Sequence, residues 1–259
     1  MFLEFDKFQG AGNDFIMVDN RNGALVDPSK DQIVRITDRK FGIGADGFIL
    51  LNPSLGNDFH MEFYNPDGSR SFCGNGARCA VAFAQYRGGT MGFNRFTAVD
   101  GLHDYRVEDE ISIRMQDVNN VIHFDGTRGF VHTGSPHYIL QSIDLTTENV
   151  LKWGRQVRYS EAYAAEGVNV NLGFVKEGTL IEIATYERGV ENETLSCGTG
   201  ATACALYFAD QLGMENGFLN VQTKGGLLQV SFDKSEDGGY HNIWLKGPAT
   251  RVFSGRIEL

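Results

Sequence analysis

Basic residues are scarce in this sequence. Its 259 residues include 23 Lys and Arg against 33 Asp and Glu, which gives a formal net charge of −10. Binding to nucleic acid depends on Lys and Arg neutralising phosphates, and anionic membranes attract the same side chains. We therefore expect neither nucleic acid nor a membrane surface as a partner.

Long apolar runs are also missing. No stretch approaches the roughly 18 apolar residues of a membrane span, and the N-terminal segment MFLEFDKFQG has no basic segment followed by an apolar run. A spanning helix and a secretory signal peptide are therefore not expected. The default expectation is a cytoplasmic protein.

Cysteine and proline are few, at four and five residues. Four cysteines in a chain of this length do not make a disulfide scaffold. Their spacings, Cys73 to Cys79 and Cys197 to Cys204, do not match the CxxC spacing of zinc sites, so no metal is expected. The 32 glycines and 42% hydrophobic residues are typical of a folded protein with many tight turns, and this length favours two lobes.

Three landmarks occur twice, in the same order and at a nearly constant offset. Together they predict two homologous halves. We expect a boundary near residues 115–130, giving lobes 1–120 with Cys73 and 121–259 with Cys197, and a C-terminal strand that is able to cross back to the first lobe. The paired landmarks are Gly12–Ile16 with Gly134–Ile139, Cys73–Ala77 with Cys197–Ala201, and Thr97–Leu102 with Thr223–Leu227.

Each half places its cysteine between a strand and a helix. Strands are expected at 61–65 and 181–186. Helices are expected at 77–85 and in the run that follows Gly198-Thr199-Gly200 and extends to Leu212, so each cysteine lies on a glycine-rich loop that enters a helix. Two further helices are expected, one opened by Asp27-Pro28-Ser29 with the proline at an early helical position, the other at 149–157.

The position of the cysteines suggests acid–base chemistry. Helix N-termini lower the pKa of a thiol and accommodate anions. Free cysteines usually fill space in the core, and we expect that role for Cys79 and Cys204, inside the helices. Inverting a stereocentre requires a proton donor and an acceptor on opposite faces of a planar intermediate. Cys73 and Cys197 therefore predict an enzyme that inverts a carbon beside a carboxylate held at the helix N-termini.

The chain resembles the diaminopimelate epimerases along nearly its whole length. The matching motifs are FQGAGNDF at 8–15, GIGADG at 42–47, NPDGSRSFCGNGARC at 65–79, GSPH at 134–137, EGVN at 166–169 and ERGVENETLSCGTGATA at 187–203. The resemblance implies a cofactor-independent isomerase of lysine and peptidoglycan-precursor biosynthesis that interconverts LL- and meso-diaminopimelate. It also implies an α+β fold of two pseudo-symmetric lobes, each a curved, mostly antiparallel sheet around a central helix, with the active site in the cleft between them.

The resemblance also assigns roles to residues. Cys73 and Cys197 match the catalytic pair, and His137 and Glu187 match residues that tune the thiols. Backbone donors around the reacting carboxylate match Gly74, Asn75, Gly198 and Thr199, and polar substrate contacts match Asn13, Asn65, Asn169, Glu187 and Arg188. From the residues alone, a turn role suits Asn13 and Asn65, a surface ion pair suits Glu187 with Arg188, and His137 suits a loop.

Some positions depart from the family pattern. Gly47 stands where some members have glutamine, and Ser135 where many have asparagine. The segment from Asn65 to Cys73 is one residue shorter than usual, and the stretch after Asn169 is longer. Phe253 occupies a position that often holds a tyrosine at a dimer interface, so a homodimer is expected by resemblance.

Two other functions remain open from the sequence. A proline or hydroxyproline racemase would use the same two cysteines on a cyclic substrate with little beyond its α-carboxylate, whereas Arg188, Asn65 and Asn169 favour a second charged end. A thiol redox or metal-binding protein would instead work through a Cys73–Cys197 disulfide or a bound zinc ion.

Overall fold

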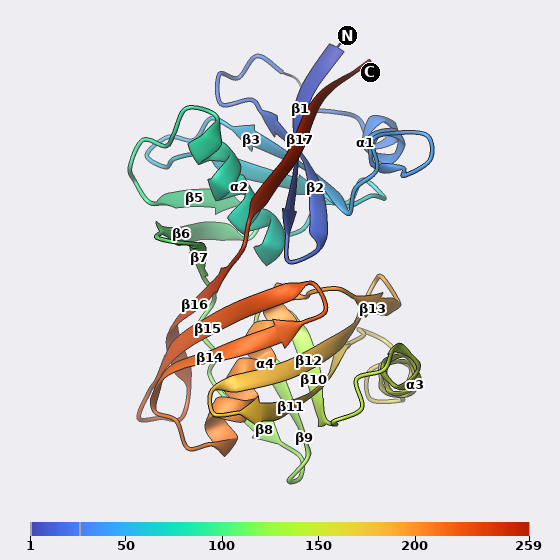
Figure 1. The fold of residues 1–259 in the computed structure, drawn as a ribbon, viewed down its shortest axis with the longest axis vertical. Helices are drawn as coiled ribbons and strands as arrows, with labels where there is room; N and C mark the ends of the chain where they lie inside the picture. Colours follow the sequence, from blue (N-terminus) through green and yellow to red (C-terminus); the bar gives the residue numbers. More distant parts are fainter. Residues whose placement is uncertain (1, 26, 259) are drawn as a thin grey trace. The chain divides into compact units, whose positions relative to one another are not determined.

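The computed structural model describes residues 2–25 and 27–258, which divide into two compact units. Unit 1 comprises Met1–Ile113 and Gly247–Leu259, and unit 2 comprises Arg114–Lys246. The division lies a few residues before the boundary at residue 120 that the sequence suggested. The C-terminal segment belongs to unit 1. Each unit combines strands with two helices, which is an α+β fold (Figure 1).

Unit 1 is a sheet with one helix enclosed and one outside. β1 pairs with both β17 and β2 in antiparallel fashion. The elements are β1 (Phe2–Gly10), β2 (Asn13–Asp19), α1 (Lys30–Thr37), β3 (Gly47–Asn52), β4 (His60–Tyr64), α2 (Gly74–Tyr86), β5 (Arg95–Ala98), β6 (Gly101–Val107), β7 (Ile111–Arg114) and β17 (Thr250–Glu258).

Unit 2 repeats this plan. Its elements are β8 (Val121–His123), β9 (Arg128–His132), β10 (Pro136–Gln141), α3 (Thr147–Arg158), β11 (Asn169–Glu177), β12 (Leu180–Glu187), β13 (Asn192–Thr194), α4 (Gly198–Gln211), β14 (Asn216–Thr223), β15 (Gly226–Lys234) and β16 (Tyr240–Gly247).

The strand pairings of the two units correspond. In unit 1, β2–β3 and β4–β5 are parallel, whereas β3–β4 and β5–β6 are antiparallel. In unit 2, β10–β11 and β12–β14 are parallel, whereas β11–β12 and β14–β15 are antiparallel. The register of the first parallel pair also agrees in the two units. Phe15 of β2 lies opposite Gly47 of β3, and the corresponding His137 of β10 lies opposite Asn169 of β11. The duplicated landmarks of the sequence therefore occupy matching places in the two units.

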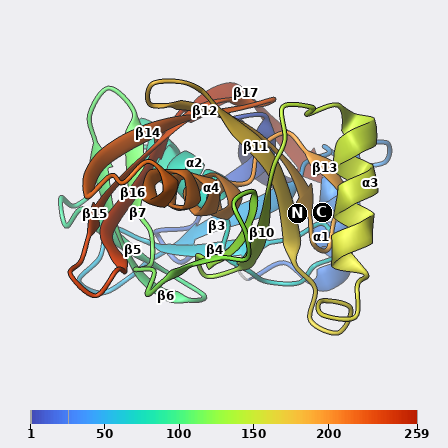
Figure 2. The ribbon, with the colours of Figure 1, turned by 90° about the horizontal axis from the view of Figure 1, so that it is seen from below.

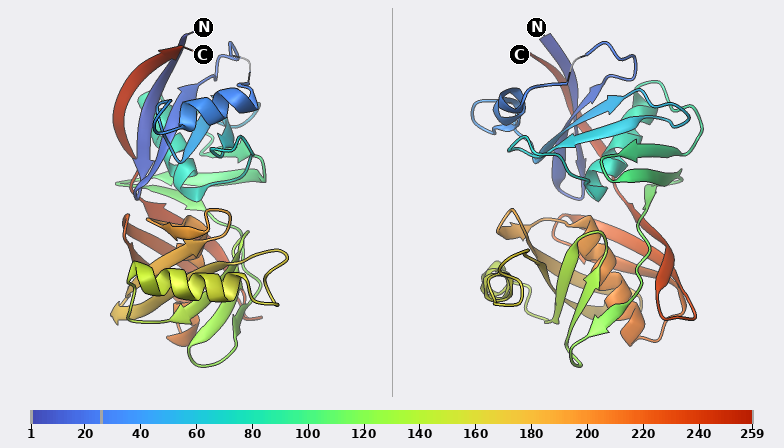
Figure 3. Two further views of the ribbon diagram at one scale, coloured as in Figure 1. Left: turned by 90° about the vertical axis from the view of Figure 1, so that its right-hand side faces the viewer. Right: turned by 180° about the vertical axis from the view of Figure 1, so that it is seen from behind.

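The central helices α2 and α4 form the cores. α4 is buried on nearly all sides, from Ala201 through Ala209, which suits a helix that is apolar all round. Strands β8 to β12 and β14 to β15 surround it (Figure 3). α2 packs against β1 to β4 through a cluster that includes Phe15, Ile49 and Phe83.

The outer helices are amphipathic. α3 packs on β11 and β12 and lies outside the sheet of unit 2 (Figure 2). Its Gly154 allows the close approach, because a Cβ atom there would lie 2.3 Å from Cγ of Tyr186. α1 begins after Ser29, whose hydroxyl accepts from Gln32 N–H while the Gln32 side chain accepts from Ser29 N–H.

Three expected helix starts were wrong, those of α1, α2 and α4. Pro28 precedes the N-cap Ser29 and does not lie in the first turn of α1, because the capping box of Ser29 and Gln32 determines where the helix begins. The central helices start at Gly74 and Gly198, earlier than expected, since each cysteine is itself the N-cap residue and the glycines form the first turn. Among the described residues, no helix is long and apolar enough to cross a membrane.

Candidate active site

Cys73 is the N-cap residue of α2. Its backbone is extended, with φ −134° and ψ 113°, while the following residues are helical. The sulfur accepts from the Gly76 N–H at 3.4 Å and lies 3.7 Å from Oδ1 of Asn13, to which the thiol donates. A helix N-terminus and an N–H donor favour the thiolate, whereas the Asn13 carbonyl accepts the proton of the thiol. Both protonation states therefore have a partner.

Cys197 occupies the same position on α4. Its φ of −123° and ψ of 114° nearly equal those of Cys73, and its sulfur lies 3.4 Å from the Thr199 hydroxyl. Thr133 supports this turn by donating to the Thr199 carbonyl at 3.0 Å. Gly74, Asn75, Gly198 and Thr199 thus form the first helical turns, where backbone N–H groups have no acceptor within the helix.

The other two cysteines lie inside the helices. Cys79 and Cys204 are both fully buried, and none of the four cysteines is in a disulfide. Burial raises the pKa of the Cys79 thiol to about 12 and also raises the pKa of Cys204, so both stay protonated near neutral pH. Their environment suits core packing and not acid–base chemistry.

Asn13 is oriented by charged neighbours of unit 1. Its Nδ2 donates to Oδ2 of Asp46 at 2.7 Å, which leaves Oδ1 facing Cys73 and Nδ2 of Asn75, the latter at 3.5 Å. Asp46 in turn accepts from Arg39 at 2.8 Å. Asp46 lies in the GIGADG motif, but no pattern in the sequence indicates that it contacts Asn13. The contact joins the start of β2 to the residue before β3, which are far apart in the chain.

Asp14 extends this charged cluster. Arg39 donates to its Oδ1 at 2.6 Å, and the Lys7 ammonium lies 2.9 Å from Oδ2. Although burial raises the pKa of Asp14, hydrogen bonds from Arg39 and Lys7 outweigh it and lower that pKa to about 2. The carboxylate is therefore ionised at any ordinary pH, and it anchors the turn that presents Asn13.

Within the part of the chain that the structure describes, the hydrogen bonds of the Asn65 side chain are to residues close in sequence. Its Nδ2 donates to the Ser69 hydroxyl at 3.0 Å and to the Ser71 hydroxyl at 3.1 Å. Its backbone closes the same turn, with Ser69 and Gly68 as partners. These bonds are typical of a turn-forming asparagine and hold the segment that leads to Cys73.

Asn169 joins three segments of unit 2. Its Nδ2 donates to the Ser135 hydroxyl at 2.8 Å and to the Pro136 carbonyl at 3.1 Å, and its Oδ1 accepts from the Arg188 N–H at 2.9 Å. Ser135, one of the positions that depart from the expected family pattern, is therefore a partner of Asn169. The Arg188 guanidinium is exposed and donates to the Glu166 carbonyl at 3.0 Å, next to Glu187 at the end of β12.

His137 is fully buried and neutral. Burial lowers its pKa to about 3. Its Nδ1 lies 3.1 Å from Nδ2 of Asn171, so Nδ1 accepts and Nε2 has the proton, yet Nε2 has no hydrogen-bond partner among the described residues. Asn171 also accepts from Thr185 at 2.9 Å. A Cβ atom at Gly200, in the first turn of α4, would lie 2.6 Å from Asn171 Oδ1 and 3.3 Å from Cys197 Sγ.

Asn171 and Thr185 are residues that the sequence did not indicate. Asn171 lies two residues after Asn169, so the two side chains share one face of β11. That alternation was the available signal. The Asn171 side chain fixes the tautomer of His137 and packs beneath the turn that presents Cys197.

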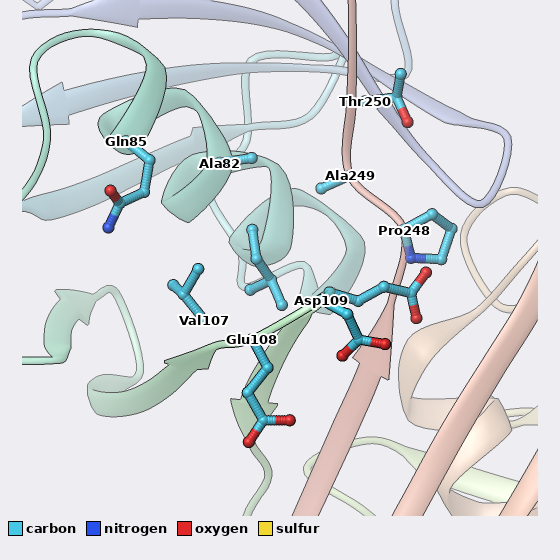
Figure 4. A pocket seen from close by; sticks show the side chains of 10 residues that line it. Ala82, Gln85, Val107, Glu108, Asp109, Pro248, Ala249 and Thr250 are labelled. Atoms are coloured by element: carbon cyan, nitrogen blue, oxygen red, sulfur yellow. The ribbon is translucent and has the colours of Figure 1, made fainter.

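A pocket of about 330 Å³ in unit 1 contains none of the predicted site residues. Ala82 and Gln85 of α2 line one side and Pro248 to Thr250 the other (Figure 4). Glu108, Asp109 and Glu110 make it anionic, so it is unsuited to a carboxylate. The predicted site residues therefore lie outside this pocket, around the cysteine turn of each unit.

Two duplicated α+β lobes, each with a free cysteine capping its central helix, define the class of proteins with the racemase-type fold. Solved structures agree on the fold. A PhzF-family phenazine biosynthesis protein from Bacillus anthracis matches with a TM-score of 0.73 at 14% identity, covering 100% of both chains. A probable proline racemase from Agrobacterium radiobacter K84 matches at 0.68 and 14%, covering 99% of this chain and 93% of the other.

Sequence comparison is more specific. The profile of the family described as Diaminopimelate epimerase matches residues 5–115 and 129–252. Diaminopimelate epimerase of Flavobacterium psychrophilum is 43% identical, covering 98% of this chain and all of the relative, and that of Aquifex aeolicus is 38% identical, covering 99% and 98%. The chain belongs to the diaminopimelate epimerase family, and it is an isomerase.

Proposed function

We propose that this protein interconverts LL- and meso-diaminopimelate, without a cofactor, by a two-base mechanism that uses Cys73 and Cys197. The observation that carries the proposal is the identical placement of the two cysteines as N-cap residues of α2 and α4. A helix N-terminus supports both a thiolate and a bound carboxylate. Near-complete coverage by relatives of that name supports the substrate.

In this mechanism one sulfur, as thiolate, takes the α-proton of the substrate. The electron pair of the broken C–H bond moves into the α-carboxylate, and the thiol of the other cysteine delivers its proton to the opposite face of the carbon. The thiolate and thiol have then exchanged roles. Backbone N–H groups of Gly74, Asn75, Gly198 and Thr199 stabilise the negative charge that develops on the carboxylate oxygens.

The second, unreactive end of the substrate is also charged. Arg188 and Glu187 suit its carboxylate and ammonium groups, because a guanidinium binds a carboxylate in bidentate fashion. Asn13 acts beside Cys73, where its carbonyl accepts the thiol proton. Asn65 and Asn169 are expected to contact this end of the substrate as well, and their amide groups also hold the segments that present Cys73 and Arg188. His137 tunes Cys197 as a neutral imidazole.

Exchange of the α-proton with solvent tests the substrate. In heavy water, deuterium should enter the α-carbon of LL-diaminopimelate, and L-proline should stay unlabelled. L-Proline is the matched control because the fold is shared with a probable proline racemase. Exchange with proline alone would overturn the proposed substrate.

Separate substitutions test the two bases. Cys73→Ser and Cys197→Ser should each lower kcat for epimerisation by about 10²- to 10⁴-fold, because each removes one of the two acid–base groups. Cys204→Ser, inside α4, is the control and should keep most of the activity. Full epimerisation in either active-site variant would refute the two-base mechanism. Activity that rises on oxidation and falls with a thiol reductant would instead support a redox protein.

A further inference from the structure

Arg78 is a buried cation for which the mechanism above has no role. It lies in the second turn of α2, its side chain is 0% exposed, and no carboxylate among the described residues forms an ion pair with it. Its Nε and Nη1 also have no hydrogen-bond partner there. A guanidinium stays charged, and an uncompensated buried charge is unfavourable. Such a residue is expected to persist where an anion or an oriented dipole needs it.

The one side-chain hydrogen bond that Arg78 makes within residues 2–25 and 27–258 begins a directional chain. Nη2 of Arg78 donates to Oδ1 of Asn75 at 2.7 Å, Nδ2 of Asn75 faces Oδ1 of Asn13 at 3.5 Å, and Nδ2 of Asn13 donates to Oδ2 of Asp46 at 2.7 Å. A guanidinium only donates and a carboxylate only accepts. The two ends therefore decide which way both amides point.

That orientation matters at Cys73. With both amides fixed, the atom that Asn13 presents to the sulfur, at 3.7 Å, is its carbonyl oxygen and not its NH₂ group. The charged and titratable groups that act on Arg78 electrostatically are Cys73, the buried Cys79 and Glu110. Glu110 is exposed, and so is Asp46 at the other end of the chain, so solvent screens both carboxylates.

Unit 2 lacks this cation. When Cys197 is aligned with Cys73, the position of Arg78 corresponds to Thr202, which is buried and donates to the Gly198 carbonyl at 3.0 Å. His137, the ionisable group beneath that site, is neutral. The two cysteine sites therefore share a backbone but differ in charge.

We propose that Arg78 is a positioning residue of the Cys73 site with two effects: it orients Asn75 and Asn13 so that the Asn13 carbonyl accepts the proton of the thiol, and its positive charge favours the thiolate. This inference rests on the proposed function, in which Cys73 alternates between thiolate and thiol. It predicts that the two sulfurs of the free protein differ in acidity, Cys73 being the more readily ionised because of Arg78.

Alkylation by iodoacetamide tests the charge without any substrate. In the Cys197→Ser protein, the rate of Cys73 alkylation is followed against pH by peptide mass spectrometry. Adding Arg78→Met should move the midpoint upward by about one pH unit. Arg78→Lys, which keeps the charge, should stay near the parent value. In the Cys73→Ser protein, Arg78→Met should leave the profile of Cys197 unchanged, which serves as the matched control.

Kinetics test the orientation. Arg78→Met and Asp46→Asn should each lower kcat/KM by about tenfold to a hundredfold, because a misplaced amide disturbs the reacting geometry. Arg78→Lys should fall between them and the parent. Asp46→Asn removes the acceptor-only end but keeps Arg78, so it should not raise the alkylation midpoint of Cys73.

The outcomes separate the proposals. A folded Arg78→Met protein with parental kcat/KM and a parental alkylation profile would overturn the role of Arg78. If circular dichroism shows that Arg78→Met is unfolded, Arg78→Lys and Asp46→Asn decide. If Arg78→Lys and Asp46→Asn both keep the parental kcat/KM, Arg78 does not act by orienting Asn75 and Asn13. If Arg78→Lys raises the midpoint of Cys73 alkylation, the positive charge of Arg78 does not explain the acidity of Cys73. Absence of diaminopimelate turnover in the parent would defeat the proposed function, while the alkylation result would still test Arg78.

Discussion

Single side chains at the two cysteine turns owe their orientation to partners distant in sequence. Asn13 is held by Asp46, and His137 by Asn171. In both places an amide or imidazole with two possible orientations is reduced to one, because its partner can only donate or only accept at the contacting atom. The orientation of each side chain is therefore determined by its hydrogen-bond partner. The amino-acid sequence does not show which residues become partners.

The stability of the protein should record the buried state of His137. Since burial lowers the pKa of His137 from 6.5 to about 3, the unfolded chain binds a proton between these values and the folded chain does not. The stabilising effect is complete above about pH 6.5 and is lost as the pH falls towards about 3. His137→Gln should therefore flatten this decline by up to about 1.4 kcal/mol per pH unit.

Urea unfolding of parent and variant at about pH 7.5, 6 and 5 measures this difference. Above neutral pH the free energies of unfolding of the two proteins should run parallel, which corrects for the packing lost in the variant. Equal slopes in parent and variant between pH 6 and 5 would show that His137 is protonated in the folded protein or reaches solvent.

Many of the individual residues of the site were predictable from the sequence. The residues that hold them in position were not. Duplication singled out Cys73 and Cys197 because the same residue occurs at the same place in both halves. Arg78 is visible as a charge in an otherwise apolar helix, and Asn171 as the alternate neighbour of Asn169. Their partners were not predictable, because contacts between distant segments exist only once the sheets have formed.

Close approach between neighbouring strands explains one departure from the family pattern. Gly47 begins β3, and a Cβ atom there would lie 2.2 Å from Cε2 of Phe63 on β4. A larger side chain at position 47, such as the glutamine that the family resemblance leads us to expect in some members, therefore does not fit beside this phenylalanine. The side chain that Gly47 lacks is replaced by the ring of Phe63, which contacts Phe15 edge-on.

Gly47→Ala should accordingly lower the free energy of unfolding by about 1–3 kcal/mol, because the ring or the strand must shift. Gly126→Ala is the matched control, since nothing lies within 4 Å of its added Cβ atom and its backbone is compatible with alanine. The control should stay within about 0.5 kcal/mol of the parent. Equal losses in the two variants, measured by urea unfolding, would contradict the steric explanation.

The elements themselves were largely evident from the sequence. Strands expected at 61–65 and 181–186 correspond to β4 and β12, and the helix expected at 149–157 lies within α3. The starts of α2 and α4 were missed because glycine disfavours helix interiors, so Gly74-Asn75-Gly76 suggested a loop. At the first turn that preference matters less than close backbone packing, as at Gly76, where a Cβ atom would lie 3.0 Å from Ile49.

Association of the whole chain is expected along β17. This strand pairs with β1 in antiparallel fashion, and most of its residues are exposed, Val252 at 55% and Phe253 at 45%. The exposed Val252 and Phe253 side chains on this strand favour contact with another chain. The resemblance places an aromatic residue of a dimer interface at Phe253, so a homodimer remains our prediction.

Phe253→Asp should shift the protein towards monomer, because it places a charge at the centre of that strand. Phe41→Asp is the control, since Phe41 is 84% exposed and lies in a loop outside the sheet. Sedimentation velocity over a range of concentrations measures the effect. A parent that is monomeric throughout, or a variant that dimerises as tightly as the parent, would contradict the interface.

The pairing of β1 with β17 also has a consequence for synthesis on the ribosome. Unit 2 is one continuous stretch, so it is able to fold as soon as Lys246 has emerged. Unit 1 contains both β1 and β17, and β1 lacks its partner β17 until residues 250–258 have been synthesised. A nascent chain released before β17 has been synthesised therefore exposes the unpaired edge of β1. Unpaired strand edges of this kind promote aggregation between incomplete chains.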